Sequence, residues 1–292
     1  MAYPIIDCLT GPWIMLDGQL LDPQCAEARC CFLPTDERMF YEVIRIEAKI
    51  PLFWEDHLMR LNRSIQDRMA IPESLYQDSL RLIAANNLDQ VNLRLVLTPG
   101  HVVLHQIPSY YPSAEQMRLG VATGILDWER VDPNVKEINS DYKAAVAARF
   151  AKGGPFGSLF ELLLADRQGD LTEGSRSNLF FISGNLVYSA PDNRILKGIT
   201  RQYVSAAIAS AGGQLVEKMI TYSAIQEGQV DAAFLSGSPI DLLPIAAIES
   251  VQLPSATNPL FSRINQAYQQ IVRDYLKAHQ KQIIQVQGGP HT

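Results

Sequence analysis

Apolar and polar positions along the chain follow two periods. Alternating apolar residues, or short apolar runs between turn residues, predict strands, and Asp17-Gly18 predicts a tight hairpin between two of them. Apolar residues spaced three and four apart predict helices. Strands are predicted at 13–16, 19–21, 40–46, 50–53, 91–97, 102–106, 119–125, 159–164, 179–182, 185–188, 215–220 and 232–235. Helices are predicted at 55–69, 73–85, 135–151, 200–211 and 258–281.

A polar stretch with two prolines, at 107–116, interrupts this pattern. Because domain boundaries fall in exposed polar segments, we place a junction between about 108 and 132. The sequence therefore predicts a mixed α/β protein with a small domain at 1–118 and a larger one at 119–292. A chain of 292 residues is long enough to bury two such cores.

Composition narrows the classes of partner. The net charge is −6 and no basic run occurs, so nucleic acid and anionic membrane, which require clustered Lys and Arg, are not expected partners. No run of about 18 apolar residues occurs, and residues 1–10 lack the pattern of a signal peptide. We therefore expect a soluble, cytoplasmic protein.

The cysteines and histidines do not favour a metal site. Cys8, Cys25, Cys30 and Cys31 are few and irregularly spaced, and none belongs to a CxxC pair. His101 and His105 would share one face of a strand and could form a metal pair, but we expect two half-exposed side chains.

Three short polar strings lie where strands or helices begin or end. The first, LTEGSRSNLF at 171–180, places an acid before an apolar run and alone predicts a loop entering a strand. The second, ILKGITR at 195–201, opens a helix whose free N–H groups suit a phosphate group, although a simple helix cap also explains it. The third, FLSGSP at 234–239, ends a strand in hydroxyls and alone predicts a tight turn.

Two further strings precede these. YEVIR at 41–45 belongs to a predicted strand, and EDHLMRL at 55–61 opens a predicted helix. Arg60 lies three residues after His57, near the polar side of that helix. A lone helical arginine is usually a solvated charge, so this string carries no function by itself.

In their order and spacing, these strings resemble the successive signatures of the class IV (fold-type IV) enzymes that use pyridoxal 5′-phosphate (PLP). This group holds the branched-chain aminotransferases, the D-amino-acid aminotransferases and the aminodeoxychorismate lyases. The resemblance covers most of the chain, from position 40 to position 250. It implies a small N-terminal α/β domain, a larger C-terminal pseudo-barrel domain, a site in the cleft between them, and a homodimer whose partner chain closes the pocket.

The resemblance also assigns cofactor contacts. Glu173 matches the acid that faces the pyridine nitrogen, where a carboxylate keeps the nitrogen protonated and lets the ring take up carbanion charge. Arg60 matches the arginine on the phosphate, and Ser238 matches a hydroxyl donor. The remaining matches are Ile199 and Thr200 as backbone and hydroxyl donors to the phosphate, Leu196 as the apolar residue beneath the ring, and Tyr41 as a tyrosine near the cofactor.

The resemblance also requires a lysine that binds the cofactor covalently and then moves a proton. Lys136 and Lys143 both precede Glu173. The stretch VKEIN around Lys136 resembles the family pattern of lysine, two residues and asparagine, whereas Lys143 lacks that asparagine. We therefore assign Lys136 as the catalytic residue, with Lys143 as the alternative.

The substrate side is less well defined. Arg94 lies in a strand at a place resembling an arginine of branched-chain enzymes, where it could bind a carboxylate in a bidentate way; an edge-strand arginine in solvent is an equal alternative. The chain reads LPTDERMF at 33–40, where the family usually has Asp-Arg-Gly and a Gly-Asp-Gly-like turn. Because these residues help to shape the substrate pocket in the family, the resemblance does not indicate the substrate, but the departure does not affect the expected cofactor.

The resemblance implies an aminotransferase that moves an amino group between an amino acid and a 2-keto acid. A lyase of the aminodeoxychorismate type, releasing pyruvate, is the alternative on the same scaffold. A PLP-binding homologue without catalysis is a third possibility. A dehydrogenase is disfavoured because no GxGxxG string follows a predicted strand.

Overall fold

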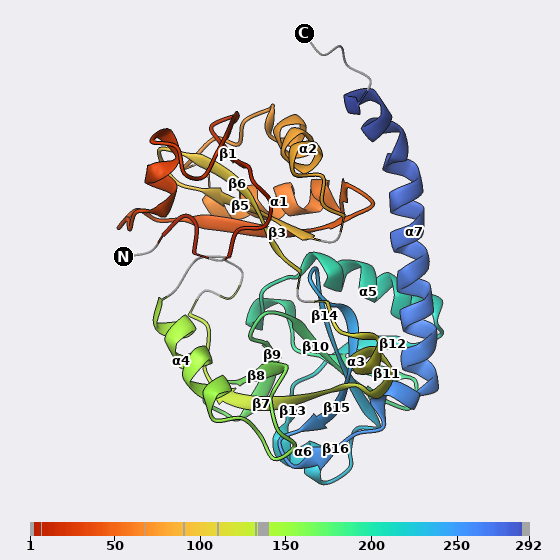
Figure 1. Cartoon of the computed structure of the whole chain (residues 1–292). Helices are drawn as coiled ribbons and strands as arrows, with labels where there is room; N and C mark the ends of the chain where they lie inside the picture. Colours follow the sequence, from red (N-terminus) through yellow and green to blue (C-terminus); the bar gives the residue numbers. More distant parts are fainter. Residues whose placement is uncertain are drawn as a thin grey trace. The chain divides into compact units, whose positions relative to one another are not determined.

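A computed structural model of the chain describes residues 3–6, 8–66, 68–89, 91–109, 111–131, 133 and 140–287. The described residues form two compact units (Figure 1). The first holds the residues up to 109 together with those from Val272 on, and the second holds 111–131 and 141–271. Every helix within the described residues is too short or too polar to cross a lipid bilayer.

The first unit is built on one antiparallel sheet with the strand order β2-β1-β6-β5-β3-β4. The hairpin predicted at Asp17-Gly18 is confirmed, because Leu16 pairs with Gln19 across it. The strands are β1 (Ile14–Leu16), β2 (Gln19–Leu21), β3 (Phe40–Glu47), β4 (Ile50–Pro51), β5 (Val91–Leu97) and β6 (Val102–Pro108).

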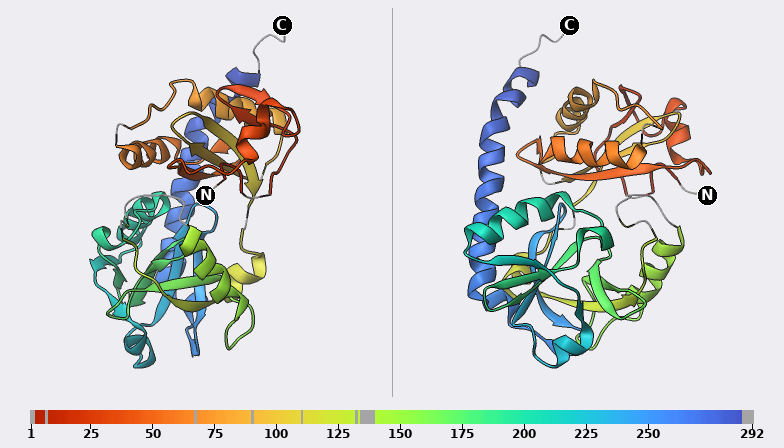
Figure 2. Two further views of the ribbon diagram at one scale, coloured as in Figure 1. Left: turned by 90° about the vertical axis from the view of Figure 1, so that its left-hand side faces the viewer. Right: turned by 180° about the vertical axis from the view of Figure 1, so that it is seen from behind.

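The central strand β3 gives this sheet two different faces. Its residues alternate between buried and half-buried, as successive side chains of a strand point to opposite faces. One face is covered by α1 (Trp54–Ile65) and α2 (Leu75–Asn86) (Figure 2). The other packs against the N-terminal segment and the short helix η1 (Glu27–Phe32), around Ile14, Val96 and Val103. Glu42 lies on the helix-covered face, and Tyr41 lies on the opposite one.

The second unit is built on a sheet of ten strands among the described residues, in the order β12-β11-β10-β14-β15-β7-β8-β9-β13, with β16 paired to β15. Strand β7 pairs in parallel with both β8 and β15, so the sheet is mixed. The strands are β7 (Val121–Asp127), β8 (Glu161–Ala165), β9 (Asp170–Gly174), β10 (Asn178–Ser183), β11 (Leu186–Ser189), β12 (Gln214–Glu217), β13 (Ile220–Thr221), β14 (Ala232–Gly237), β15 (Asp241–Ile248) and β16 (Val251–Gln252).

Helices lie around this sheet. Helix α5 (Ile199–Ser210) packs against β14 and β12 (Figure 1). The others are α3 (Ala114–Leu119), α4 (Ser140–Ala151), the 3-10 turns η2 (Asp192–Arg194) and η3 (Ser255–Thr257), α6 (Tyr222–Gln226) and α7 (Pro259–Gln287), whose residues from Val272 on belong to the first unit. The predicted mixed α/β class is confirmed.

Three local predictions were wrong. The stretch predicted as irregular, 107–116, contains the start of α3, because Ser113 and Gln116 form a capping box. The helix predicted to reach residue 69 ends at Ile65, where Gln66 adopts a left-handed conformation with φ 49°. The string TEG at 172–174, predicted to be a loop, belongs to β9.

Candidate functional site

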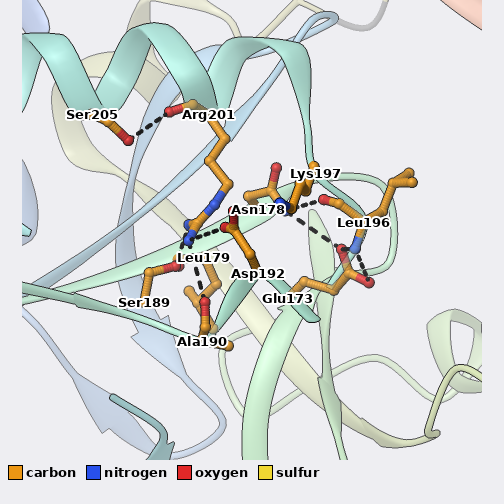
Figure 3. A network of polar contacts seen from close by, with 10 residues as sticks. All are labelled: Glu173, Asn178, Leu179, Ser189, Ala190, Asp192, Leu196, Lys197, Arg201 and Ser205. Atoms are coloured by element: carbon orange, nitrogen blue, oxygen red, sulfur yellow. Dashed lines mark hydrogen bonds and ion pairs between the residues drawn. The ribbon is translucent and has the colours of Figure 1, made fainter. Parts of the chain in front are cut away.

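Glu173 places a carboxylate in the interior of the second unit. It lies next to last in β9 and its residue is 2% exposed. The backbone N–H of Leu196 donates to both carboxylate oxygens, at 3.3 and 3.2 Å. Figure 3 shows the carboxylate pointing toward the strand-to-helix segment that carries Leu196 and Lys197. Two residues that the sequence assigned to one site, Glu173 and Leu196, are therefore in contact.

Asn178 connects the first and second signature strings. It opens β10, is 4% exposed, and donates from Nδ2 to the carbonyl of Leu196 at 2.9 Å and more weakly to Glu173 at 3.5 Å (Figure 3). A Cβ added to Gly198 would lie 2.1 Å from Asn178 Oδ1. Any larger residue at 198 would therefore displace the Asn178 side chain, because the backbone passes close to it.

The start of α5 provides donors for an anion. Gly198 is the N-cap residue and makes no side-chain capping bond, so the first N–H groups of the helix keep their donor capacity. Ile199 and Thr200, both predicted phosphate donors, open this helix and are 1% and 2% exposed. Thr200 Oγ1 is buried and has no hydrogen-bond partner within the described residues.

A second hydroxyl without a partner lies on the neighbouring strand. Ser236 in β14 is 0% exposed, its Oγ has no hydrogen-bond partner within the part of the chain that the structure describes, and it pairs across the sheet with Asn178. The signature string indicated Ser238 instead, which lies half-buried after the end of β14. The sequence did not indicate Ser236, because the string holds two serines near the end of a strand. Only the register of β10 and β14 shows which hydroxyl lies beside Asn178.

The first turn of α5 is fixed to the sheet by Arg201. This arginine is 5% exposed and donates to Ser189 Oγ, to the carbonyl of Ala190 at 3.2 Å and to Asp192 at 3.4 Å (Figure 3). The ion pairs of Asp192 with Lys197 and Arg201 outweigh the effect of burial and lower the pKa of Asp192. Arg201 therefore holds the helix start in place from beneath.

Arg130 is a contact of Glu173 that no sequence pattern indicated. Its Nε lies 2.7 Å from Glu173 Oε1, and its guanidinium stacks over the ring of Tyr142 at 5.1 Å. The Tyr142 hydroxyl in turn donates to the carbonyl of Ser175 at 2.8 Å. Residues on both sides of the segment 134–139 thus contact the first signature string.

The loop after Glu173 is held by a second buried acid. Glu161 in β8 is 1% exposed and accepts from the hydroxyls of Ser175 and Ser177 and from the backbone N–H of Arg176. These three donors follow Gly174 directly, so Glu161 fixes the turn between β9 and β10. The small polar residues of the first string therefore serve this turn.

In the first unit, Arg60 is held by a buried acid. Both Arg60 Nε, at 2.7 Å, and Nη2 donate to Glu42, and His57 Nδ1 lies 2.8 Å from Glu42 Oε2. Burial alone would raise the pKa of Glu42, but Arg60 and His57 hold it far below its usual value. Arg60 is 8% exposed rather than solvated. The sequence signal that could have indicated Glu42 is an acidic residue at one of the alternating buried positions of a predicted strand.

Tyr41, Arg94 and His105 share the other face of that sheet. The Arg94 guanidinium lies 4.6 Å from the centre of the Tyr41 ring, and Arg94 pairs with His105 in the adjacent strand. Arg94 is 5% exposed, so it is not an edge-strand arginine in solvent. Burial, with Arg94 nearby, lowers the pKa of His105 to about 3.

The histidine expectation was wrong for His105, which is 0% exposed and has no hydrogen-bond partner on either ring nitrogen among the described residues. His101 is exposed and pairs with Asp17 at 2.7 Å. Nowhere among the described residues do three or more His, Cys, Asp or Glu side chains come together in a way that could hold a metal ion.

Lys136, the assigned catalytic lysine, lies outside the described residues. The alternative, Lys143, lies on α4 with its side chain exposed. The position of Lys136 therefore stays a prediction.

The residues around Glu173 fit PLP at both ends of that molecule. A buried carboxylate, oriented by a backbone N–H, suits a protonated ring nitrogen. A helix start without a side-chain cap, together with the hydroxyls of Thr200 and Ser236, which lack partners among the described residues, suits a phosphate group. Two separate features of one site thus match one cofactor.

Comparisons with known proteins identify the family and the fold of this chain. The model of the family "Amino-transferase class IV" matches residues 39–248. The D-alanine aminotransferase of Bacillus licheniformis is 27% identical over 285 residues, which cover 88% of this chain and 95% of that protein. The branched-chain aminotransferase of the archaeon Thermoproteus uzoniensis, crystallised with norvaline, superposes with a TM-score of 0.75 at 23% identity and covers 91% of this chain and 98% of its own. Another branched-chain aminotransferase, crystallised with pyridoxamine 5′-phosphate, also gives a TM-score of 0.75, at 19% identity and 92% and 98% coverage. The predicted fold class is confirmed.

Proposed function

The chain belongs to the amino-transferase class IV family, and on this premise we propose that it is a PLP-dependent aminotransferase. It would move an amino group between an amino acid and a 2-keto acid. The family assignment made from the signature strings is confirmed, whereas the reaction and the substrate are proposals.

One observation carries the proposal. The buried Glu173 carboxylate accepts the backbone N–H of Leu196, which lies two residues before Gly198, the N-cap residue of α5, so hydrogen bonds join the carboxylate to a helix start that suits an anion. When bound, PLP supplies a ring that takes up the electron pair left after an α-proton is removed from an amino acid. Glu173 would keep the ring nitrogen protonated, which strengthens that capacity.

The other residues would bind and orient. Thr200 would donate its hydroxyl to the phosphate, and the N–H groups at the start of α5 would donate beside it. Arg60 would add a positive charge for the phosphate, with Glu42 fixing the orientation of its guanidinium. Ser238 and Tyr41 stay proposed contacts of the cofactor.

Two residues would act on the substrate. Lys136 would hold the cofactor covalently and then carry the α-proton on its amino group. Arg94, buried against Tyr41, would bind a substrate carboxylate. The names of the relatives suggest D-alanine and branched-chain amino acids as the first substrates to try.

The test is an amino-transfer assay on the PLP-loaded protein. Each donor would be offered with and without 2-oxoglutarate, and amino acid and keto acid products would be measured. Transfer that requires the acceptor, and that is lost in Glu173→Gln, supports the aminotransferase. Release of pyruvate without an acceptor would favour the lyase, and cofactor binding with neither product would favour the homologue without catalysis.

A further inference from the structure

The ion pair between Arg130 and Glu173 is the feature of the second unit that the proposed function does not explain. Arg130 Nε lies 2.7 Å from Glu173 Oε1, and the two side chains are 21% and 3% exposed. A carboxylate so far removed from water is costly unless charged or polar groups compensate it. The hydrogen-bond donors to Glu173 described above, the Leu196 N–H and the Asn178 amide, are neutral, so Arg130 adds a positive charge beside this carboxylate.

The guanidinium also packs against an aromatic ring. It lies 5.1 Å from the centre of the Tyr142 ring, and that ring lies 5.3 Å from the ring of Trp128. The backbone N–H of Trp128 donates to the carbonyl of Ala165 at 2.9 Å, and Tyr142 donates to the carbonyl of Ser175. The ring against which Arg130 packs is therefore held by Trp128 and by Ser175 of the first signature string.

We propose that Arg130 is a positioning residue that keeps the Glu173 carboxylate charged and oriented toward the cofactor ring nitrogen. Arg130 acts through Glu173 rather than on the ring or the substrate. The arrangement is built before the cofactor binds, so the carboxylate need not reorganise at that moment. This inference rests on the proposed function, since it assumes that Glu173 faces PLP.

The test is a double-substitution cycle on PLP affinity, read from the dissociation constant in an equilibrium titration of the apoprotein. Arg130→Gln should weaken binding on the order of tenfold, and Arg130→Lys should restore most of it because a cation returns. In a Glu173→Gln background, Arg130→Gln should have no further effect. Arg167→Gln is the matched control, because Arg167 is an arginine with an 87% exposed side chain that pairs only weakly with Glu129, at 3.4 Å.

A second readout tests the ion pair itself in the protein without PLP. The same four proteins of the cycle would be unfolded by urea without PLP, where the stability effects of Arg130→Gln and Glu173→Gln should again be strongly non-additive. Additive effects on affinity, or an Arg130→Gln protein that binds PLP as the wild type does, would overturn the proposal while leaving PLP binding intact. A wild type that binds no PLP would overturn the proposed function, and the role of Arg130 with it.

Discussion

At several positions a buried charged side chain holds neighbouring elements together, and Glu42 is the clearest case. It is fully buried, yet Arg60 and His57 both contact it, so three ionisable groups share one interior site. The sequence alternation places Glu42 on the buried phase of β3, whereas the helical pattern placed Arg60 near the polar side of α1. Local patterns indicated each position but could not show that the two side chains meet, because pairing depends on how α1 packs on the sheet.

Replacing Glu42 should destabilise the protein strongly. Glu42→Ala leaves Arg60 buried without its counter-ion, which costs about 3–5 kcal/mol in the free energy of unfolding. Urea denaturation at pH 7 measures it, and Glu37→Ala, at an exposed glutamate, should have almost no effect. A loss below about 1 kcal/mol would show that Glu42 is not the buried counter-ion that Arg60 needs.

The same group predicts a pH dependence. Because the folded-state pKa of Glu42 is lowered from 4.5, its stabilisation is complete above that value and is lost as the pH falls below it. The acid side of the stability profile, measured by urea denaturation at a series of pH values, should therefore be flatter in Glu42→Gln than in the wild type.

His105 predicts a separate pH effect at milder acidity. Its pKa is lowered from 6.5 to about 3, so between these values the unfolded chain binds a proton that the folded chain does not. Stability should therefore fall with decreasing pH by up to about 1.4 kcal/mol per unit. His105→Phe should reduce this slope between pH 6 and 5, above the range of Glu42. An unchanged slope in His105→Phe would show that the histidine is not buried and neutral.

Elements were predicted best where one period dominates. Strands β3, β5 and β6 and helix α5 lie close to their predicted ranges, because each repeats a clear apolar pattern. Strand β15 was not predicted: Pro244 lies inside it, next to a register shift in its pairing with β7, and a proline lowers any strand expectation. The predicted strand at 215–220 is two strands, β12 and β13, which pair with different partners. The two strands are distinguished by their pairing partners, which lie far away in the sequence, and a local pattern does not indicate such pairing.

The junction of β10 with the start of α5 gives a prediction for an element boundary. Gly198 has a φ of −68°, so alanine there meets no backbone strain, only Asn178 Oδ1 at 2.1 Å. Gly198→Ala should push Asn178 off the Leu196 carbonyl and cost about 1–3 kcal/mol in urea denaturation.

A companion substitution tests the cause. Asn178→Ala removes the side chain that an alanine at 198 would meet, so the double variant should lose less stability than the sum of the two single variants. Gly100→Ala, at a glycine with open space around it, is the control and should be nearly neutral. Strict additivity of Gly198→Ala and Asn178→Ala would mean that the contact is not the reason for glycine.

At the scale of the whole molecule, the family and the fold class were predictable because the signature strings keep their order over most of the chain. Each string alone was ambiguous. The residues TEG, predicted to be a loop, belong to strand β9, and the start of α5 has no side-chain cap. In the third string, the hydroxyl that lies beside Asn178 is that of Ser236 rather than Ser238. What the strings could not supply were the contacts of Glu161 and Arg130, which lie outside them, and those of Arg201, which ends the second string. The fold brings these residues to their partners, and no local pattern indicates those contacts.

Assembly is the prediction that belongs to the whole chain. We expect a homodimer, as the family resemblance implies. Sedimentation velocity at micromolar concentration should give the mass of two 32.5 kDa chains. A monomer that nevertheless transfers amino groups would show that no partner chain is needed to complete the site.

We propose that this chain binds PLP through Lys136, with Glu173 on the ring nitrogen. Borohydride reduction of the PLP-loaded protein followed by peptide mapping tests both the cofactor and the lysine, for the wild type beside Lys136→Ala and Lys143→Ala. We expect a visible cofactor band and a label on Lys136, both retained in Lys143→Ala and lost in Lys136→Ala. A label on Lys143 would overturn the lysine assignment, and a wild type with no band and no label would show that the protein does not bind PLP in this way.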